Sequence, residues 1–194
     1  MAVEREIKLR FDSAGDARER ILSIGATPLR GRRRQEDSLL DSPDDQLYRR
    51  RCVLRVRAEN GKSLLTFKGP VQPGVMKLRE EHETVVADGD ALVTILHELG
   101  MRVWFRYEKF REEFSAADVV IAIDETPVGV YVEIEGGEER IHQTAAALGK
   151  TQVDYLTDSY RTLFLNHCRT HGLDPTNMLF DAVAPVALGV PVSE

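Results

Sequence analysis

VEREIKLRF, residues 3–11, alternates charged Glu4, Glu6 and Lys8 with apolar Ile7 and Leu9. Successive side chains of a β-strand point to opposite faces, so the pattern predicts a strand with one charged face and one largely apolar face. The charged face either lies in solvent on the outside of a sheet or points into a cavity as a row of ligands. A solvated face is the commoner case for an antiparallel sheet. The rest of the sequence has to distinguish the two.

The composition is that of a globular, charge-rich protein. The 194 residues are 42% hydrophobic and 30% charged, which is enough chain for one domain with an accessory element. We expect a domain over residues 1–170 and a C-terminal tail over 171–194. The tail is apolar but broken by prolines, and we expect it to pack on the domain or to form a contact in a homodimer.

The same composition argues against several classes of partner. No stretch has the roughly 18 to 20 apolar residues of a membrane span, and charges begin at Glu4, which excludes the apolar core of a signal peptide. The net charge of −6 argues against nucleic-acid binding as the main task. Cys52 and Cys168 have no metal-binding spacing. We therefore expect a reduced, cytoplasmic protein without disulfides.

The sequence predicts an α+β fold with about eight strands. Asn60-Gly61 between two β-rich runs is a strong hairpin signal, and frequent hairpins favour an antiparallel sheet that curls or closes. A turn is expected at residues 41–45, and Trp104 is expected to pack in the core. The expected strands lie in 3–11, 27–42, 51–69, 76–86, 103–115 and 119–136, and the expected helices at 13–24, 89–100, 138–149 and 157–172.

Charged residues two positions apart recur on six of these strands. They are Glu4, Glu6 and Lys8; Arg55 and Arg57; Lys68 with Thr66; Arg79, Glu81 and Glu83; Lys109 and Arg111; and Glu133 and Glu135. Most sort by strand into cations or anions, whereas a face that serves solubility normally mixes the signs. Two like charges ~5 Å apart repel by roughly 3 kcal/mol at an effective dielectric of about 20. Solvent relieves that repulsion on an exposed face; in a barrel interior, we expect a polyanion and a metal to do so.

Such a charged face has an evident chemistry. Carboxylates from two strands offer the hard oxygen ligands that Mg²⁺ or Mn²⁺ prefer. Lysine and arginine on the other strands can hold a chain of phosphates. A metal ion and fixed cations together lower the barrier to phosphoryl transfer. The sequence has no glycine-rich phosphate loop, so side chains would hold the anion.

Glu4-x-Glu6-x-Lys8 resembles the ExExK signature of the CYTH superfamily, the triphosphate tunnel metalloenzymes. This superfamily includes class IV adenylate cyclases, thiamine triphosphatases and inorganic triphosphatases. ExExK alone is a weak pattern, and six further motifs downstream make the likeness specific. In order, LRVR, TFKGP, REEHE, YEKFR, IDETPVGVYVEIEG and SYRTLF complete a resemblance over residues 2 to 165.

The resemblance implies an eight-stranded antiparallel barrel that forms a tunnel with a charged lumen. It implies divalent-metal ligands at Glu4, Glu6, Glu133 and Glu135, and Asp124 either assists the metal or only ends a strand. Glu4, Glu6 and Lys8 would be the catalytic residues. The implied substrate-binding residues are Lys8, Arg55, Arg57, Lys68, Arg79, Lys109 and Arg111.

The expected function is Mg²⁺- or Mn²⁺-dependent hydrolysis of a triphosphate-containing small molecule: inorganic triphosphate, thiamine triphosphate or a nucleoside triphosphate. The alternative is a class IV adenylate cyclase that converts ATP to cyclic AMP and pyrophosphate. A second alternative is a non-catalytic binder of polyphosphate or nucleotides, which needs the cations but not the carboxylates. No residue distinguishes hydrolysis from cyclisation.

Overall fold

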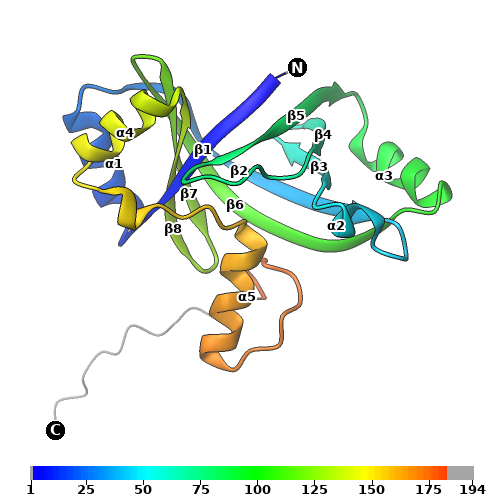
Figure 1. Cartoon of the computed structure of the whole chain (residues 1–194). Coiled ribbons are helices and arrows are strands. Elements are labelled where there is room, and N and C mark those ends of the chain that lie inside the picture. Colours follow the sequence, from blue (N-terminus) through cyan, green and yellow to red (C-terminus); the bar gives the residue numbers. More distant parts are fainter. Residues whose placement is uncertain (1, 183–194) are drawn as a thin grey trace, which may run out of the picture.

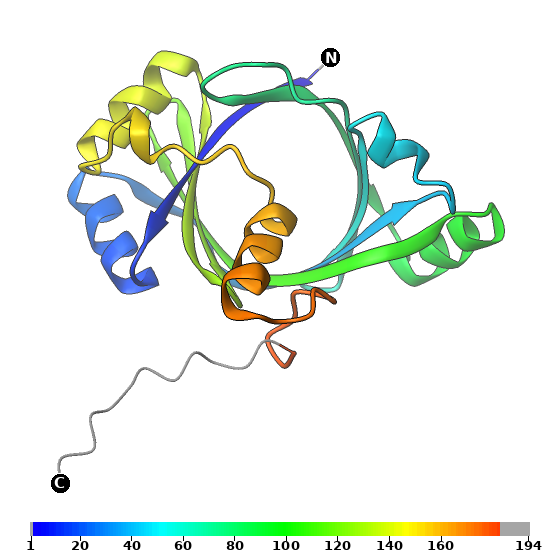
Figure 2. The same cartoon turned by 60° about the horizontal axis from the view of Figure 1, so that its bottom comes forward.

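The computed structural model describes residues 2–182. Within them, eight antiparallel strands close into a barrel in the order β1-β5-β4-β3-β2-β6-β7-β8, which confirms the predicted α+β barrel. Figure 2 looks into the ring that they form. The strands are β1 (Ala2–Phe11), β2 (Thr27–Asp41), β3 (Val53–Glu59), β4 (Lys62–Lys68), β5 (Lys77–Val86), β6 (Arg102–Ala116), β7 (Val119–Thr126) and β8 (Gly129–Gly136).

Local turn chemistry sets the register of the hairpins. Asn60 and Gly61 have φ of 48° and 71°, the left-handed conformation that a tight hairpin turn requires and that asparagine and glycine tolerate. They join β3 to β4, in which Glu59 faces Lys62. Arg55 on β3 consequently lies opposite Thr66 on β4.

Helices cover the outside of the barrel. In Figure 1, α1 (Ala14–Ser23) and α4 (Glu138–Ala147) lie on one side and α3 (Gly89–Glu98) on the other. The longest helix within residues 2–182, α5 (Tyr160–His171), begins after the N-cap residue Ser159, whose hydroxyl accepts from the Thr162 N–H. It lies at one end of the barrel (Figure 2). A short 3₁₀ helix, η1 (Gln152–Asp154), precedes it.

The helix α2 (Gln46–Arg49) begins just after the turn predicted at residues 41–45 and is absent from the prediction. Its cap comes from farther back in the chain than a local N-cap does. The buried carboxylate of Asp41 accepts the N–H groups of Leu47 and Tyr48 at 2.9 and 2.8 Å. A cap so far upstream has no sequence signature comparable with a normal N-cap.

The main apolar core lies outside the barrel wall. Ile7 and Leu9 point outward from β1 and are fully buried beneath Ile21 of α1 and Ile141 of α4. On the same strand, the alternate residues Glu6 and Lys8 are buried toward the inside. The apolar half of the opening pattern therefore holds the helices, and the charged half faces the lumen.

A second core anchors the C-terminal part of the chain to the barrel. Phe164 of α5 packs with Phe105 of β6, and the fully buried Met178 belongs to the same cluster. The backbone of Met178 exchanges hydrogen bonds with Arg106 and Glu108 of β6, at 3.0 and 2.9 Å. The first part of the predicted tail thus packs on the barrel; residues 183–194 lie outside the described residues, and the division at residue 170 stays a prediction. No described helix has the length and apolar character needed to cross a bilayer.

Candidate active site

A cavity of about 1050 Å³ lies inside the barrel. Strands β1 to β6 and β8, together with helices α2 and α5, contribute residues to its lining. All the site residues predicted from the sequence line it: Glu4, Glu6, Lys8, Arg55, Arg57, Lys68, Arg79, Lys109, Arg111, Glu133 and Glu135. The strand periodicity thus brings together residues that are far apart in the chain. Their individual roles stay predictions.

The carboxylates of β1 and β8 form one side of the cavity. Glu6 lies opposite Glu135 in the strand register, and Lys8 lies opposite Glu133. The Lys8 Nζ is 2.9 Å from Glu6 Oε1 and 3.1 Å from Glu133 Oε1. Lys77, on β5, approaches the same Glu6 oxygen at 2.6 Å. Glu6 is thereby held between two buried ammonium groups.

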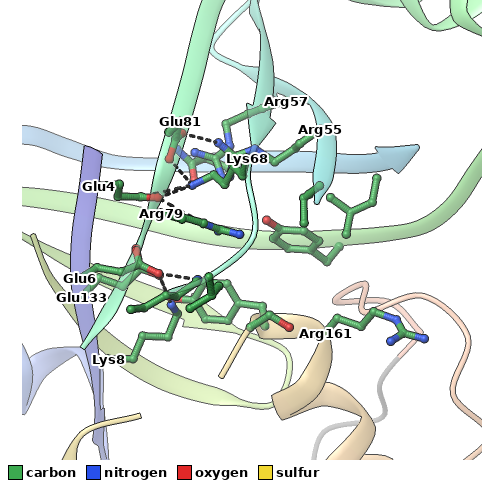
Figure 3. Close-up of a pocket in the computed structure, with 18 of the residues that line it drawn as sticks. Glu4, Glu6, Lys8, Arg55, Arg57, Lys68, Arg79, Glu81, Glu133 and Arg161 are labelled. Atoms are coloured by element: carbon green, nitrogen blue, oxygen red, sulfur yellow. Dashed lines mark hydrogen bonds and ion pairs between the residues drawn. The ribbon is translucent and has the colours of Figure 1, made fainter. Parts of the chain in front are cut away.

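Glu4 belongs to a second group of charges, which lies nearer the start of β1. The Lys68 Nζ is 3.0 Å from Glu4 Oε2 and 2.6 Å from Glu81 Oε2. Arg79 also approaches Glu4, at 3.6 Å. Figure 3 shows this group beside the one that contains Glu6, Lys8 and Glu133.

The arginines and Lys109 are held by two buried aspartates. Asp37 of β2 accepts two hydrogen bonds from Arg57, at 2.9 and 3.2 Å. Asp124 of β7 accepts from Lys109 at 2.7 Å and from Arg111 at 2.7 and 2.6 Å. Both aspartates are almost completely buried, so they fix the direction of the cations that extend into the cavity.

Two further contacts complete this cationic wall. Arg111 also pairs with Glu133, which links the wall to the carboxylates. The hydroxyl of Tyr160, the first residue of α5, donates to Asp124. The Tyr160 ring lies 4.7 Å from the Lys109 ammonium. The helix α5 is therefore attached directly to the charged interior.

Burial and mutual repulsion shift several pKa values in the cavity. Burial raises the pKa of Glu135 to about 7, and repulsion from Glu4, Glu6 and Glu133 adds to the effect. Burial also favours neutral Glu6, but Lys8, Lys77 and Lys68 together outweigh it and hold the Glu6 pKa well below its ordinary value.

The pKa values of the buried lysines also shift, some downward and one upward. Burial lowers the pKa of Lys109 to about 8, assisted by neighbouring Arg111 and opposed by Asp124. Burial also lowers the pKa of Lys77 to about 8, with Lys8 as the next cause. Burial alone would lower the Lys8 pKa, but Glu133 and Glu6 outweigh it and raise that pKa above its ordinary value. Lys109 and Lys77 therefore lose their charge as the pH rises through about 8.

The β1–β8 carboxylates fit a divalent cation by their chemistry. Among residues 2–182 no three histidine, cysteine, aspartate or glutamate side chains are already gathered as a metal site. Nevertheless, Glu135 has no ion pair within the described chain. Burial raises the pKa of Glu4, and a hydrogen bond to Glu81 and repulsion from Glu6 raise it further. A hard cation placed among these oxygens would relieve the repulsion. The metal ligands predicted here stay a prediction.

One expectation about this face is wrong in part. The repulsion between like charges was expected to need a polyanion and a metal, but ion pairs across strands already relieve much of it. Lys68 with Glu4 and Glu81 is one example, and Arg57 with Asp37 is another. The sorting of charges by strand arises because each cationic strand lies beside a strand that carries acids.

Several residues of the cavity wall were not predicted as site residues. Lys77 could have been found, because it lies two residues before Arg79 on the same strand face. Arg33 and Gln35 also line the cavity and alternate at a spacing of two with the buried Asp37, but the surrounding run of arginines resembles an exposed basic segment. In the structure Arg32 and Arg34 do point outward, toward Glu125 and Glu108. The alternation in this run can be recognised only once the strand is known.

Comparison with known proteins places this arrangement among related folds. The model of the CYTH domain family matches residues 2–160. A protein of Methanocaldococcus jannaschii named "Putative adenylate cyclase MJ0240" is 28% identical over 134 residues, which are 69% of this chain and 76% of that protein.

Two solved structures have the same fold. One is described as a "putative adenylate cyclase" from Vibrio parahaemolyticus; it has a TM-score of 0.74 and 20% identity, and the match covers 82% of this chain and 96% of that one. The other is a "putative adenylyl cyclase" from Hippeastrum described as revealing a dominant triphosphatase activity. It has a TM-score of 0.67 and 18% identity over 84% of this chain and 95% of that one.

Proposed function

This chain belongs to the CYTH domain family, and from that premise we propose that it is a divalent-metal-dependent phosphohydrolase acting on a triphosphate inside its barrel. The observation that carries the proposal is the charged lumen. A wall of oriented arginines and lysines faces the carboxylates of β1 and β8 across one cavity. An enzyme function also agrees with the names of the relative and with the activity described for the Hippeastrum protein.

The cations suit a chain of phosphates. Arg55, Arg57 and Arg111 present planar guanidinium groups, which bind phosphate oxygens in bidentate fashion. Asp37 and Asp124 hold them in place before any anion arrives, so little conformational entropy is lost when the anion binds. A polyanion would also compensate for the cations that remain only partly paired, such as Arg79, whose Nε has no hydrogen-bond partner within the described structure.

The carboxylates suit the metal. Glu4, Glu6, Glu133 and Glu135 would hold Mg²⁺ or Mn²⁺, which when bound neutralises phosphate charge and activates a water molecule. In hydrolysis the water oxygen bonds to the terminal phosphorus, the bond from that phosphorus to its bridging oxygen breaks, and the shorter phosphate leaves. Lys8, between Glu6 and Glu133, would contact the phosphates beside the metal ligands.

Adenylate cyclisation is the alternative, favoured by the names of the M. jannaschii and V. parahaemolyticus proteins. There the ribose 3′-hydroxyl bonds to the α-phosphorus and pyrophosphate leaves. Both reactions need charge neutralisation and in-line placement, which the same lumen provides. We favour hydrolysis because a described activity, rather than a name alone, belongs to the Hippeastrum fold relative.

The test is to incubate the purified protein with Mg²⁺ or Mn²⁺ and, separately, ATP, thiamine triphosphate and tripolyphosphate, and to resolve orthophosphate, pyrophosphate and cyclic AMP. Orthophosphate release that stops on metal chelation supports the proposal. Formation of cyclic AMP with equimolar pyrophosphate from ATP would contradict the hydrolase proposal and show that the protein is an adenylate cyclase.

Variants separate an enzyme from a binder. Glu4→Gln and Glu6→Gln should lower metal-dependent turnover at least about 100-fold, because each removes a charged ligand, while calorimetry still detects triphosphate binding. Glu139→Gln, on the exposed outer helix α4, is the matched control and should keep full activity. Binding without turnover of any of the three substrates, in parent and variants alike, would favour the non-catalytic binder.

A further inference from the structure

The end of the cavity next to α5 carries a group of aromatic side chains. Tyr48, Trp104 and Tyr107 all line the cavity there, together with Arg161. We call these four residues the aromatic mouth. The charged lumen and the aromatic mouth belong to one continuous cavity, so a single ligand can contact both.

A β-bulge turns Trp104 toward the mouth. Leu39 of β2 pairs with Phe105, but the next residue, Leu40, pairs with Val103, which leaves Trp104 as an extra residue on β6. Bulges of this kind redirect a side chain. As a result the rings of Trp104, Phe105 and Tyr107 follow one another on the same side, with centroids 6.0 and 5.9 Å apart.

Arg161 completes the mouth from α5. Its guanidinium carbon lies 4.7 Å from the centroid of the Trp104 ring and 6.0 Å from that of Tyr48. Within residues 2–182 Arg161 makes no ion pair, unlike the buried arginines of the lumen. Figure 3 shows it apart from the group formed by Glu4, Lys68 and Glu81. Tyr48 is 61% exposed, so the mouth offers open aromatic surface to a ligand.

We propose that the aromatic mouth binds the planar heteroaromatic ring of an organic triphosphate and so selects such substrates over inorganic tripolyphosphate. This rests on the proposed function, because it assumes that the phosphates occupy the lumen. Trp104 provides the stacking surface, and Arg161 can stack on a ring or donate to its heteroatoms.

The spacing along β6 agrees with such a ligand. Lys109, on the cationic wall, is five residues from Trp104 on one strand, or roughly 16 Å at about 3.3 Å per residue. That separation leaves room for a linking group, such as a sugar, between a ring at the mouth and phosphates at Lys109. Inorganic tripolyphosphate has neither ring nor linker and would leave the mouth without a ligand.

Trp104 is the only tryptophan in the sequence, so its fluorescence reports on the mouth directly. The experiment titrates the intact protein with ATP and, at matched ionic strength, with tripolyphosphate. We expect ATP to quench or shift the emission and tripolyphosphate to bind, by calorimetry, with little optical change. Binding of both anions with the same emission response would overturn the subsite and leave the proposed function standing. Absence of binding by either anion would overturn both.

Variants test the selectivity without relying on turnover. Trp104→Leu and Arg161→Ala should raise the ratio of the Kd for ATP to the Kd for tripolyphosphate by about tenfold, the size of one stacking contact, and Trp104→Phe should restore most of it. Arg32→Ala is the control. The Arg32 guanidinium carbon lies 3.6 Å from the centroid of the Phe110 ring, and neither residue lines the cavity. If Arg161 only anchored α5, Arg161→Ala would leave the ratio unchanged, and an unchanged ratio in both Trp104→Leu and Arg161→Ala would overturn the subsite.

Discussion

Lys8 on the first strand lies 3.1 Å, Nζ to Oε1, from Glu133 on the last. The pair stands where β1 and β8 meet to close the ring, and Glu6 takes the other side of the ammonium. Lys8 is 2% exposed. One buried cation therefore pairs with two carboxylates where the barrel closes.

Replacing Lys8 by methionine should destabilise the protein by about 3–5 kcal/mol, because two buried carboxylates lose their shared cation. Urea denaturation monitored by circular dichroism measures the change. Arg102→Met removes the exposed ion pair with Asp45 and should cost less than about 1 kcal/mol. Equal losses in the two variants would contradict a structural role for Lys8.

Glu135 should make the metal-free protein less stable as the pH rises. Its pKa is raised from the ordinary 4.5 to about 7, so ionisation is harder in the folded state. The resulting penalty is absent below about pH 4.5, grows between pH 4.5 and pH 7, and is complete above about pH 7. In EDTA, Glu135→Gln should therefore be more stable than the parent by about 1–2 kcal/mol near pH 8, after allowance for partial exposure, and no more stable near pH 4.

The metal provides the internal check for that variant. Added Mg²⁺ should reduce the difference in stability between Glu135→Gln and the parent at pH 8, because a bound cation relieves the same repulsion in the parent. Thermal unfolding at both pH values, with and without Mg²⁺, measures all four conditions. A gap that is the same at pH 4 and pH 8 would show that charge at Glu135 is not its cause.

Binding of tripolyphosphate without metal should weaken above pH 8. Lys109 has its pKa lowered to about 8, so its ammonium is present below that pH and lost above it. The loss of one charged contact weakens binding about tenfold. Lys109→Arg stays charged and should show a smaller decline, with the remainder due to Lys77, whose pKa is also about 8. Calorimetry over a pH series compares the two proteins, and titration of the anion itself cancels in their ratio.

Tyr160→Phe should lower the free energy of unfolding by about 1–2 kcal/mol, because the buried carboxylate of Asp124 loses a donor. Tyr155→Phe is the matched control. Its hydroxyl lies 2.9 Å from His142 Nδ1 in a half-buried position, and we expect a loss below about 0.5 kcal/mol. Equal losses of unfolding free energy in the two variants, measured by urea denaturation, would mean that the contact between Tyr160 and Asp124 stabilises the protein no more than the half-buried contact of Tyr155 does.

The strands and the lining of the cavity could be predicted because both depend on local alternation. Glu4, Glu6 and Lys8 share a face by the period of a strand alone, and Asn60-Gly61 fixes the hairpin between β3 and β4. The partner of each charge could not be predicted in this way. Lys8 meets Glu133, and Lys68 meets Glu4, only because the ring closes, and closure joins residues that no local pattern relates.

The unpredicted parts of the site are of two kinds. Asp37 stands in a run where outward and inward arginines follow each other, so composition conceals the alternation. Trp104 packs against the second core cluster, as the sequence predicts, but a bulge also turns it toward the cavity, which the sequence does not predict. An inserted strand residue reverses the facing of its neighbours, and the sequence has no clear signal for the insertion.

Placing the first strand between β5 and β8 has a consequence for the order of events during synthesis. β1 is made before the other described strands, whereas one of its two partners, β8, is made after all the others. Until then Ile7 and Leu9 lack the helix α4 that buries them, and Lys8 lacks its ion pair with Glu133. Such long-range contacts slow folding, and the nascent chain exposes an unpaired strand edge. The charges that equip the strand for its lumen also protect it during this interval, because a charged edge resists pairing with other chains.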